Sequence, residues 1–206
     1  MKTRLANQFM GRASVINKWL KKNIDSRYLN LGSGPRGLDD PKWMNIDGFM
    51  DKNVHFVSDF NKPLPFPDNT FDGIFCEHVL EHFDYSHGQK LMSECMRVLK
   101  PGGVVRIIVP NGLTILKSYF ERPDFIVKYK ECKTKFPMEA VNTWFYQRYE
   151  HQCIYDAAYL SGMLLDVGYK EARESAYRQS AFGKTELELD DPKYEWESLI
   201  VEAIKQ

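Results

Sequence analysis

The sequence predicts an α/β fold with a parallel sheet, because strand patterns alternate with helical ones along its central part. Residues 84–99 form a helical pattern in which Leu91, Cys95 and Leu99 recur at the i, i+4 spacing of one helix face. This helix is expected to end before Pro101, since Pro-Gly-Gly cannot continue it. Apolar, strand-like runs stand on both sides of it, at YLNLG, WMNID, VHFVSD, FDGIFCE and VVRIIVP. Such an alternation implies a parallel sheet that is covered by helices.

Two further elements are predicted in the last quarter of the chain. Asp156 can cap a helix that Gly168 ends. The tail WESLIVEAIK is interpreted as a final strand, because Ile200 and Val201 are β-branched.

The domain organisation follows from shifts in composition. Residues 1–27 carry seven basic side chains against Asp25 alone, and we interpret them as an N-terminal helical segment with a solvated basic face. Its apolar residues recur at near-helical spacing, at Leu5, Phe9, Ile16, Trp19 and Leu20. Residues 28–206 are expected to form one domain. Within it, residues 113–150 hold nine aromatics among charged residues, which favours a mobile lid or substrate insertion.

Composition excludes several classes of protein. The 206 residues contain 28 basic and 28 acidic side chains, and this zero net charge disfavours a nucleic-acid partner. No apolar run reaches the length of a membrane span, so no membrane partner is expected. The four cysteines (Cys76, Cys95, Cys132 and Cys153) form no CxxC pair, as is typical of reduced thiols in a cytoplasmic protein.

The turn LGSGPRG, with Gly32, Gly34 and Gly37, follows the first predicted strand and matches the dinucleotide pattern GxGxxG. Only eight residues, two of them proline, separate Gly34 from the next strand at Trp43, which is too short for the usual crossover helix. Asp47 follows Gly37 after ten residues instead of the usual ~20. The turn therefore lacks the helix that would bind a pyrophosphate, but it is followed by an acid placed for a ribose diol. This combination favours a nucleoside ligand such as S-adenosylmethionine.

The stretch from Tyr28 to Asn111 resembles the class I S-adenosylmethionine-dependent methyltransferases, in the branch called methyltransferase type 11. The matching blocks are LNLGSG, NID, SDFNKPLPFPDNTFDGIFCEHVLEH and RVLKPGGVVRIIVPN. The resemblance implies a Rossmann-like sandwich, with a mostly parallel seven-stranded sheet and helices on both faces. It also implies methyltransferase activity with S-adenosyl-L-methionine as the cofactor.

The resemblance further implies a set of cofactor-binding residues. Asp47 would bind the ribose hydroxyls, Asp59 and Phe60 would lie at the adenine, and Glu77 and His78 would face the methionine moiety and the substrate. The whole expected set is Asn30, Leu31, Gly32, Ser33, Gly34, Asp47, Gly48, Ser58, Asp59, Phe60, Glu77 and His78. The chain departs from the family pattern at Asn30, where an acid is common, and at Arg36, where the third glycine is displaced. These departures bear on cofactor affinity more than on cofactor identity.

The run HVLEH, His78 to His82, also satisfies the HxxEH pattern of zinc peptidases. On a helix, His78 and His82 would share a face and could bind zinc with Glu81 as the base. A zinc site needs a third protein ligand, and the sequence singles none out. A zinc hydrolase is therefore the least favoured function, and no metal is expected.

The predicted reaction is methyl transfer to an oxygen or nitrogen of a small-molecule or carbohydrate-like acceptor. Such an acceptor often needs a general base, and histidine suits that role because its pKa lies near neutrality. His82, His151 and His78 are the candidates. The alternative is a non-catalytic S-adenosylmethionine-binding module that regulates a partner. The acceptor and the oligomeric state stay open.

Overall fold

The computed structural model describes residues 13–23, 27–129, 134–180, 188 and 192–206. Within them, one seven-stranded sheet has the order β3-β2-β1-β4-β5-β7-β6. The strands are β1 (Tyr28–Leu31), β2 (Trp43–Asp47), β3 (Phe56–Val57), β4 (Phe71–Glu77), β5 (Leu99–Pro110), β6 (Glu171–Glu174) and β7 (Ser198–Ile204). Strands β1 to β5 are parallel, whereas β7 runs antiparallel to both β5 and β6. The mostly parallel seven-stranded sheet predicted from the sequence is confirmed.

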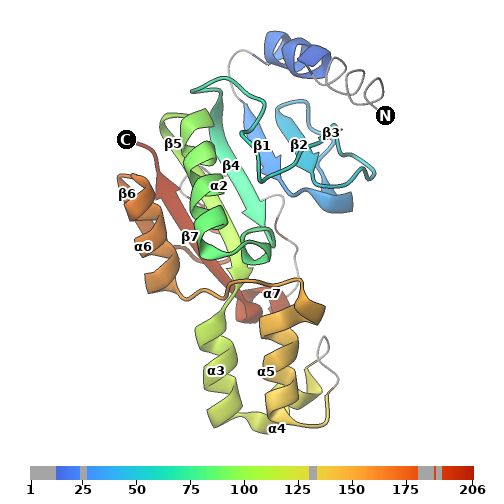
Figure 1. Ribbon diagram of the computed structural model, residues 1–206, viewed down its shortest axis with the longest axis vertical. Coiled ribbons are helices and arrows are strands. Elements are labelled where there is room, and N and C mark those ends of the chain that lie inside the picture. Colours follow the sequence, from blue (N-terminus) through green and yellow to red (C-terminus); the bar gives the residue numbers. More distant parts are fainter. Residues whose placement is uncertain (1–12, 24–26, 130–133, 181–187, 189–191) are drawn as a thin grey trace.

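The helices vary widely in length and position (Figure 1). Those longer than one turn are α2 (Tyr85–Val98), α3 (Gly112–Glu121), α4 (Pro123–Lys128), α5 (Pro137–Tyr146), α6 (Ala157–Val167) and α7 (Pro192–Glu197). Two short 3₁₀ helices, η1 (Gly34–Arg36) and η2 (Leu80–His82), and the turn η3 (Gln147–Tyr149), whose residues have positive φ, complete them. Residues 13–22 are also helical, whereas Leu5 and Phe9 of the expected N-terminal helix lie outside the described residues.

Local sequence signals explain where the two main helices begin and end. The Asp84 side chain accepts a hydrogen bond from the backbone N–H of His87 at the start of α2. Asp156 caps α6 in the same way through Tyr159, and Gly168 ends that helix in the left-handed conformation, with φ at 112°. The predicted cap at Asp156, the predicted helix end at Gly168 and the predicted final strand are confirmed, whereas the cap at Asp84 was not predicted.

The main core lies on one face of the sheet, under α2, α6 and the helix of residues 13–22. Leu31, Ile46 and Cys76 point from neighbouring strands into it and are fully buried. On the second face, Trp43, Phe75, Ile108 and Ile200 form a smaller cluster, and among the described residues Tyr28, Leu38 and Tyr177 pack against it. Among the helices of the described residues, we find none with the length and apolar character needed to cross a membrane.

The second face of the sheet is polar at β5. Arg106 is fully buried there, with its Nε 2.9 Å from Glu188 Oε1 and its Nη1 2.9 Å from Glu202 Oε1. It also donates hydrogen bonds to the carbonyl oxygens of Ala176 and Gln179. The connection between β6 and β7 is therefore attached to the sheet by one buried arginine.

Helices α3, α4 and α5 form a separate module that extends from the end of β5 (Figure 1). Its small core consists of Ile115, Ile126, Ala140, Val141 and Trp144, with Trp196 of α7 packed against it. The module corresponds to the predicted insertion at residues 113–150, although α3 begins one residue earlier, at Gly112.

Candidate functional site

A cleft with a volume of about 760 Å³ opens at the carboxyl ends of β1, β2, β3 and β4. It lies where the strand order reverses, between β1 and β4, which is where open α/β sheets bind their ligands. It is lined by Gly32, Asp47, Gly48, Phe49, Val57, Ser58, Asp59, Phe60, Asn61, His78, Val79, His82, Phe83, Tyr149, Glu150 and Gln152. Its volume falls within the usual range for small-molecule sites.

The glycine turn forms the floor of the cleft. Gly32 has a φ of +71°, and a β-carbon at this position would overlap the Cγ2 methyl of Val79. Its backbone N–H donates to the carbonyl of Ile46, which holds the turn against β2. Glycine is therefore needed here both for backbone conformation and for space.

Asp47, at the end of β2, faces the cleft beside this turn. Its Oδ2 accepts the backbone N–H of Gly34 at 2.8 Å, and its Oδ1 accepts that of Phe49 at 2.9 Å. A carboxylate has about four acceptor positions, so each oxygen keeps capacity for one more donor. Two hydroxyls of a ribose would fill that capacity, and the chemistry of Asp47 therefore fits a nucleoside cofactor.

The expected adenine-side residues follow β3. Ser58, Asp59 and Phe60 all line the cleft. Asp59 is exposed, and its carboxylate accepts a hydrogen bond from the backbone N–H of Asn61. This hydrogen bond and the nearby Lys62 both lower the pKa of Asp59. Asp59 is thus an ionised acceptor at the rim of the cleft.

Five of the expected cofactor residues do not line the cleft: Asn30, Leu31, Ser33, Gly34 and Glu77. Leu31 is core, Ser33 is buried, and Gly34 takes part through its N–H to Asp47. The Asn30 side chain points to the second face of the sheet and donates to Asn45 Oδ1 at 3.2 Å.

Glu77 is also turned away from the cleft. Its Oε2 lies 2.8 Å from Nη2 of Arg36, the residue that replaces the family's third glycine. Burial raises the pKa of Glu77, and the charge of Arg36 opposes that shift.

His78 and His82 both line the cleft, but they do not share a helix face as the HxxEH pattern predicts. His78 precedes η2 and has a φ of +52°, so it lies outside any helix. Its Nδ1 lies 2.9 Å from Oε1 of the fully buried Glu81. Burial by itself lowers the pKa of His78, but the hydrogen bond and charge of Glu81 outweigh it and raise that pKa.

His151 does not line the cleft; it is buried directly behind His82. The two imidazole rings meet edge to face, with their centroids 5.0 Å apart. The backbone carbonyl of Trp144 lies 3.0 Å from His151 Nδ1, and that of Glu150 lies 3.1 Å from His82 Nδ1. Burial lowers the pKa of His151.

The sequence did not predict that several residues line the cleft, among them Phe49, Tyr149, Glu150 and Gln152. Phe49 follows Asp47 and Gly48, so its place beside the turn was open to inference. Gln152 reaches the cleft because its Nε2 donates to the carbonyl of His82 at 3.0 Å. No local pattern signals such a contact.

The aromatics of the insertion divide into two groups. Trp144, one of the nine aromatics of the predicted insertion, belongs to the core of the helical module, and Tyr129 and Phe145 pack at the edge of that core. Tyr149, which is 91% exposed, reaches the cleft. The insertion therefore contributes its last residues to the site and keeps most of its buried aromatics for its own stability.

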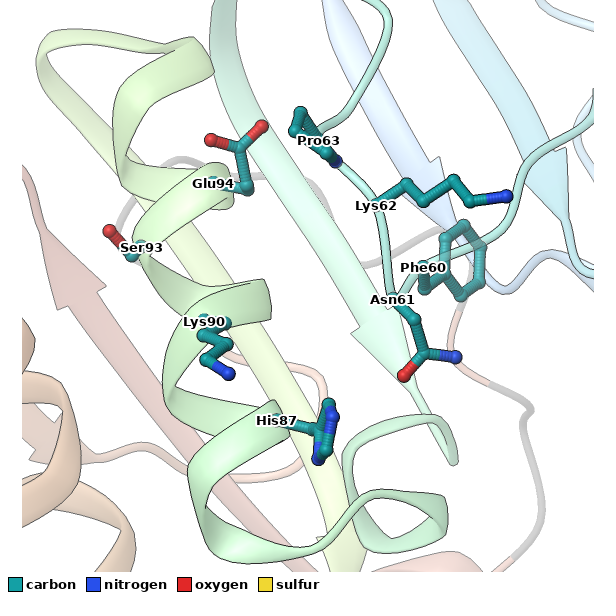
Figure 2. A pocket seen from close by; sticks show the side chains of 8 residues that line it. All are labelled: Phe60, Asn61, Lys62, Pro63, His87, Lys90, Ser93 and Glu94. Atoms are coloured by element: carbon teal, nitrogen blue, oxygen red, sulfur yellow. The ribbon is translucent and has the colours of Figure 1, made fainter.

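A second hollow, of about 310 Å³, lies between α2 and the loop after β3 (Figure 2). Lys62 and Lys90 line it, with Phe60 and Asn61 shared with the cleft. It contains neither the glycine turn nor Asp47, so it lacks the groups that fit a nucleoside.

Comparison with known proteins agrees with this geometry. A family model described as "Methyltransferase domain" matches residues 43–107. A demethylmenaquinone methyltransferase from Symbiobacterium thermophilum is 32% identical over 127 residues, which cover 61% of this chain and 46% of that protein. The chain thus spans less than half the length of this curated relative.

Two solved structures are similar in fold. A SAM-dependent methyltransferase from Archaeoglobus fulgidus superposes with a TM-score of 0.54 at 16% identity, covering 94% of this chain and 91% of that one. A protein from Thermotoga maritima, described as a possible histamine N-methyltransferase, gives a TM-score of 0.53 at 14% identity and covers 99% and 96%. At such identities the likeness concerns the fold alone.

Proposed function

We propose that this chain is a class I S-adenosylmethionine-dependent methyltransferase and that it transfers a methyl group to a small polar acceptor. Its fold and its matched segment support the first part of this proposal. The observation that carries this proposal is the Asp47 carboxylate, set beside the Gly32–Gly34 turn at the floor of a cleft that has room for both cofactor and acceptor.

The cofactor half of the cleft is formed by the turn at Gly32, by Asp47 and by the segment Ser58–Phe60. When bound, S-adenosylmethionine supplies a methyl group activated on a sulfonium. The contribution of the protein is to hold this group and the acceptor in line and to keep water away from them. Asp47 fixes the ribose end, and Phe49 and Phe60 offer aromatic surface beside it.

The acceptor half is formed by His78, His82, Tyr149, Glu150 and Gln152. Its imidazole, carboxylate and amide groups suit an acceptor that makes hydrogen bonds, which favours methylation of oxygen or nitrogen. We place His78 and His82 in contact with the acceptor, whereas the buried His151 acts through His82. This arrangement would orient a hydroxyl or amine toward the cofactor half.

Methylation of carbon in a quinone is the second candidate, because a relative of 32% identity is named for demethylmenaquinone. Transfer of labelled methyl from S-adenosylmethionine to hydroxylated, amine and quinone acceptors distinguishes the two. We expect label in the first two groups. Label in the quinone alone would replace our assignment, and cofactor binding without transfer to any acceptor would favour a regulatory S-adenosylmethionine-binding module.

Cofactor binding can be tested without knowing the acceptor. S-adenosylhomocysteine should raise the melting temperature, and NAD should not, because the crossover after β1 holds only the three-residue η1. At 100-fold excess over Kd the stabilisation is about 2.7 kcal/mol. Asp47→Asn should weaken S-adenosylhomocysteine at least tenfold, or about 1.4 kcal/mol, because the ribose loses a charged acceptor.

Asp51→Asn is the matched control, since the Asp51 side chain accepts the N–H of Lys52 in an exposed turn and does not line the cleft. The proposal would be contradicted if NAD alone raised the melting temperature, or if Asp47→Asn and Asp51→Asn bound S-adenosylhomocysteine with equal affinity.

A further inference from the structure

Glu81, His82 and His151 come together at the wall of the cleft, although His151 is far from the other two in sequence. Each offers one ligand atom, and the three atoms lie within 4.8 Å of one another. Zinc bonds of 2.0–2.2 Å place neighbouring tetrahedral donors roughly 3.4 Å apart, so the donors that lie furthest apart would approach each other by up to about 1.4 Å on binding. We infer that Glu81, His82 and His151 bind a divalent transition-metal cation.

The carboxylate of Glu81 supplies independent support. The side chain is fully buried, and its Oε1 is paired with His78. Its Oε2 is buried with no hydrogen-bond partner among the described residues. A buried carboxylate oxygen without a partner is costly, and the cost disappears when a cation binds it.

The hydrogen bonds of the two imidazoles fix tautomers that suit ligands. A carbonyl oxygen can only accept, so Nδ1 of His82 donates to Glu150 and Nδ1 of His151 donates to Trp144. The lone pair of each ring is then on Nε2. A backbone carbonyl that holds the opposite nitrogen is the usual support of a histidine that ligates a metal.

The donor set selects the class of cation. Mg²⁺ and Ca²⁺ prefer oxygen ligands alone, whereas two imidazoles and one carboxylate suit Zn²⁺ and its first-row neighbours. Three protein ligands leave a coordination position open. Since His82 also lines the cleft, that position is expected on the acceptor side.

This site differs from the one that the HxxEH pattern indicates. His78 is not a ligand here; its Nδ1 holds the other oxygen of Glu81. The third ligand that the sequence could not single out is His151. The inference that a metal binds here does not depend on methyl transfer. A role for that metal in binding an acceptor oxygen rests on the proposed function.

The test is a calorimetric titration of Zn²⁺ into the full chain after treatment with a chelator, with Co²⁺ absorption as a reporter of ligand type. We expect one Zn²⁺ per chain. Glu81→Gln, His82→Ala and His151→Ala should each weaken Zn²⁺ at least 100-fold, while His78→Ala should weaken it less, by 10- to 100-fold, as an outer partner. His87→Ala is the matched control, because that exposed histidine pairs with Asp84 outside the cleft.

Several outcomes would overturn the inference: substoichiometric Zn²⁺, equal affinity in wild type and Glu81→Gln, or a loss in His78→Ala as large as that in His82→Ala. Binding of S-adenosylhomocysteine is measured on every variant. A variant that still binds S-adenosylhomocysteine is folded. If the wild type does not bind S-adenosylhomocysteine, the proposed function is rejected, but the inference of a metal site is unaffected. Should Glu81→Gln fail to fold, His151→Gln provides the same comparison.

Discussion

Gly32 and Asp47 show how single residues shape the floor of the cleft. The two are joined through the turn, because the N–H of Gly34 donates to Asp47 while that of Gly32 donates to β2. The carboxylate is therefore held in place before any ligand arrives. Such preorganisation reduces the entropy lost on binding.

The first prediction concerns the two glycines of this turn. Gly32→Ala should destabilise the protein by about 2–4 kcal/mol, since it combines a left-handed backbone with overlap at Val79. Gly34→Ala is the matched control: its φ is +50°, but nothing lies within 4 Å of the added carbon, so about 1–2 kcal/mol is expected. Urea unfolding measures both.

A double variant separates the two causes. Val79→Ala removes the overlapping methyl, so Gly32→Ala should cost less in that background. Equal costs in both backgrounds would mean that the contact with Val79 is unimportant.

Strand β5 carries a fully buried charged side chain, Arg106, near its centre. The second prediction is that Arg106→Ala lowers the free energy of unfolding by about 3–5 kcal/mol, since it leaves Glu188 and Glu202 buried without their cation. Arg173→Ala, which breaks the exposed pair with Glu171, should cost at most about 0.5 kcal/mol. Similar small losses in both variants would show that the buried cluster does not hold the connection between β6 and β7.

Helix α2 is attached to the loop before β4 through Glu94. Its carboxylate accepts from Arg97 and from the backbone N–H of Leu64, and the Arg97 hydrogen bond lowers the pKa of Glu94 despite partial burial. A lowered pKa means that the stabilisation is present above the unfolded pKa of about 4.3 and is lost as the pH falls through the folded value.

The third prediction is therefore a pH-dependent one. Glu94→Gln should lower the free energy of unfolding by about 1 kcal/mol at pH 7, a low figure because a quarter of the side chain is exposed. The difference from wild type should shrink as the pH drops below about 4.3. Denaturant unfolding at several pH values checks this, with the exposed Glu171→Gln as control. A constant difference across the range would contradict the argument.

At the scale of the molecule, the helical module and the sheet have separate cores. The module core around Trp144 and Ile126 is much smaller than the core under α2 and α6. Between module and cleft, Gln147, Arg148 and Tyr149 all have positive φ without being glycine. Such residues store strain of order 1–3 kcal/mol each and are common beside ligand sites.

The fourth prediction follows from these two cores. With S-adenosylhomocysteine bound, amides of α3 and α5 should exchange hydrogen at least tenfold faster than those of Val104–Val109, because a small core opens at lower cost. Amides of α2 between Leu91 and Cys95 serve as a slow reference. Uniformly slow exchange across module and sheet would show that the insertion is a fixed part of the core and not a lid.

The sequence by itself predicted the alternation of strands and helices in the central part of the chain, the two capped ends of α6, and the place of Asp47 beside the glycine turn. Periodicity, caps and turn residues are local properties, so a single chain segment contains all the information that they need. The proposed cofactor half of the cleft follows from them, because parallel strands end at the same edge of a sheet.

The contacts within the proposed acceptor half were decided by the tertiary structure, although His78, His82 and His151 were already candidates from the sequence. Packing of the insertion brings His151 behind His82, and His78, which itself has a left-handed backbone, contacts Glu81. The same long-range packing turns Glu77 to Arg36 and places Trp144 in the module core. Contacts between residues far apart in the chain depend on how whole elements fit together, and no spacing within one segment encodes that fit.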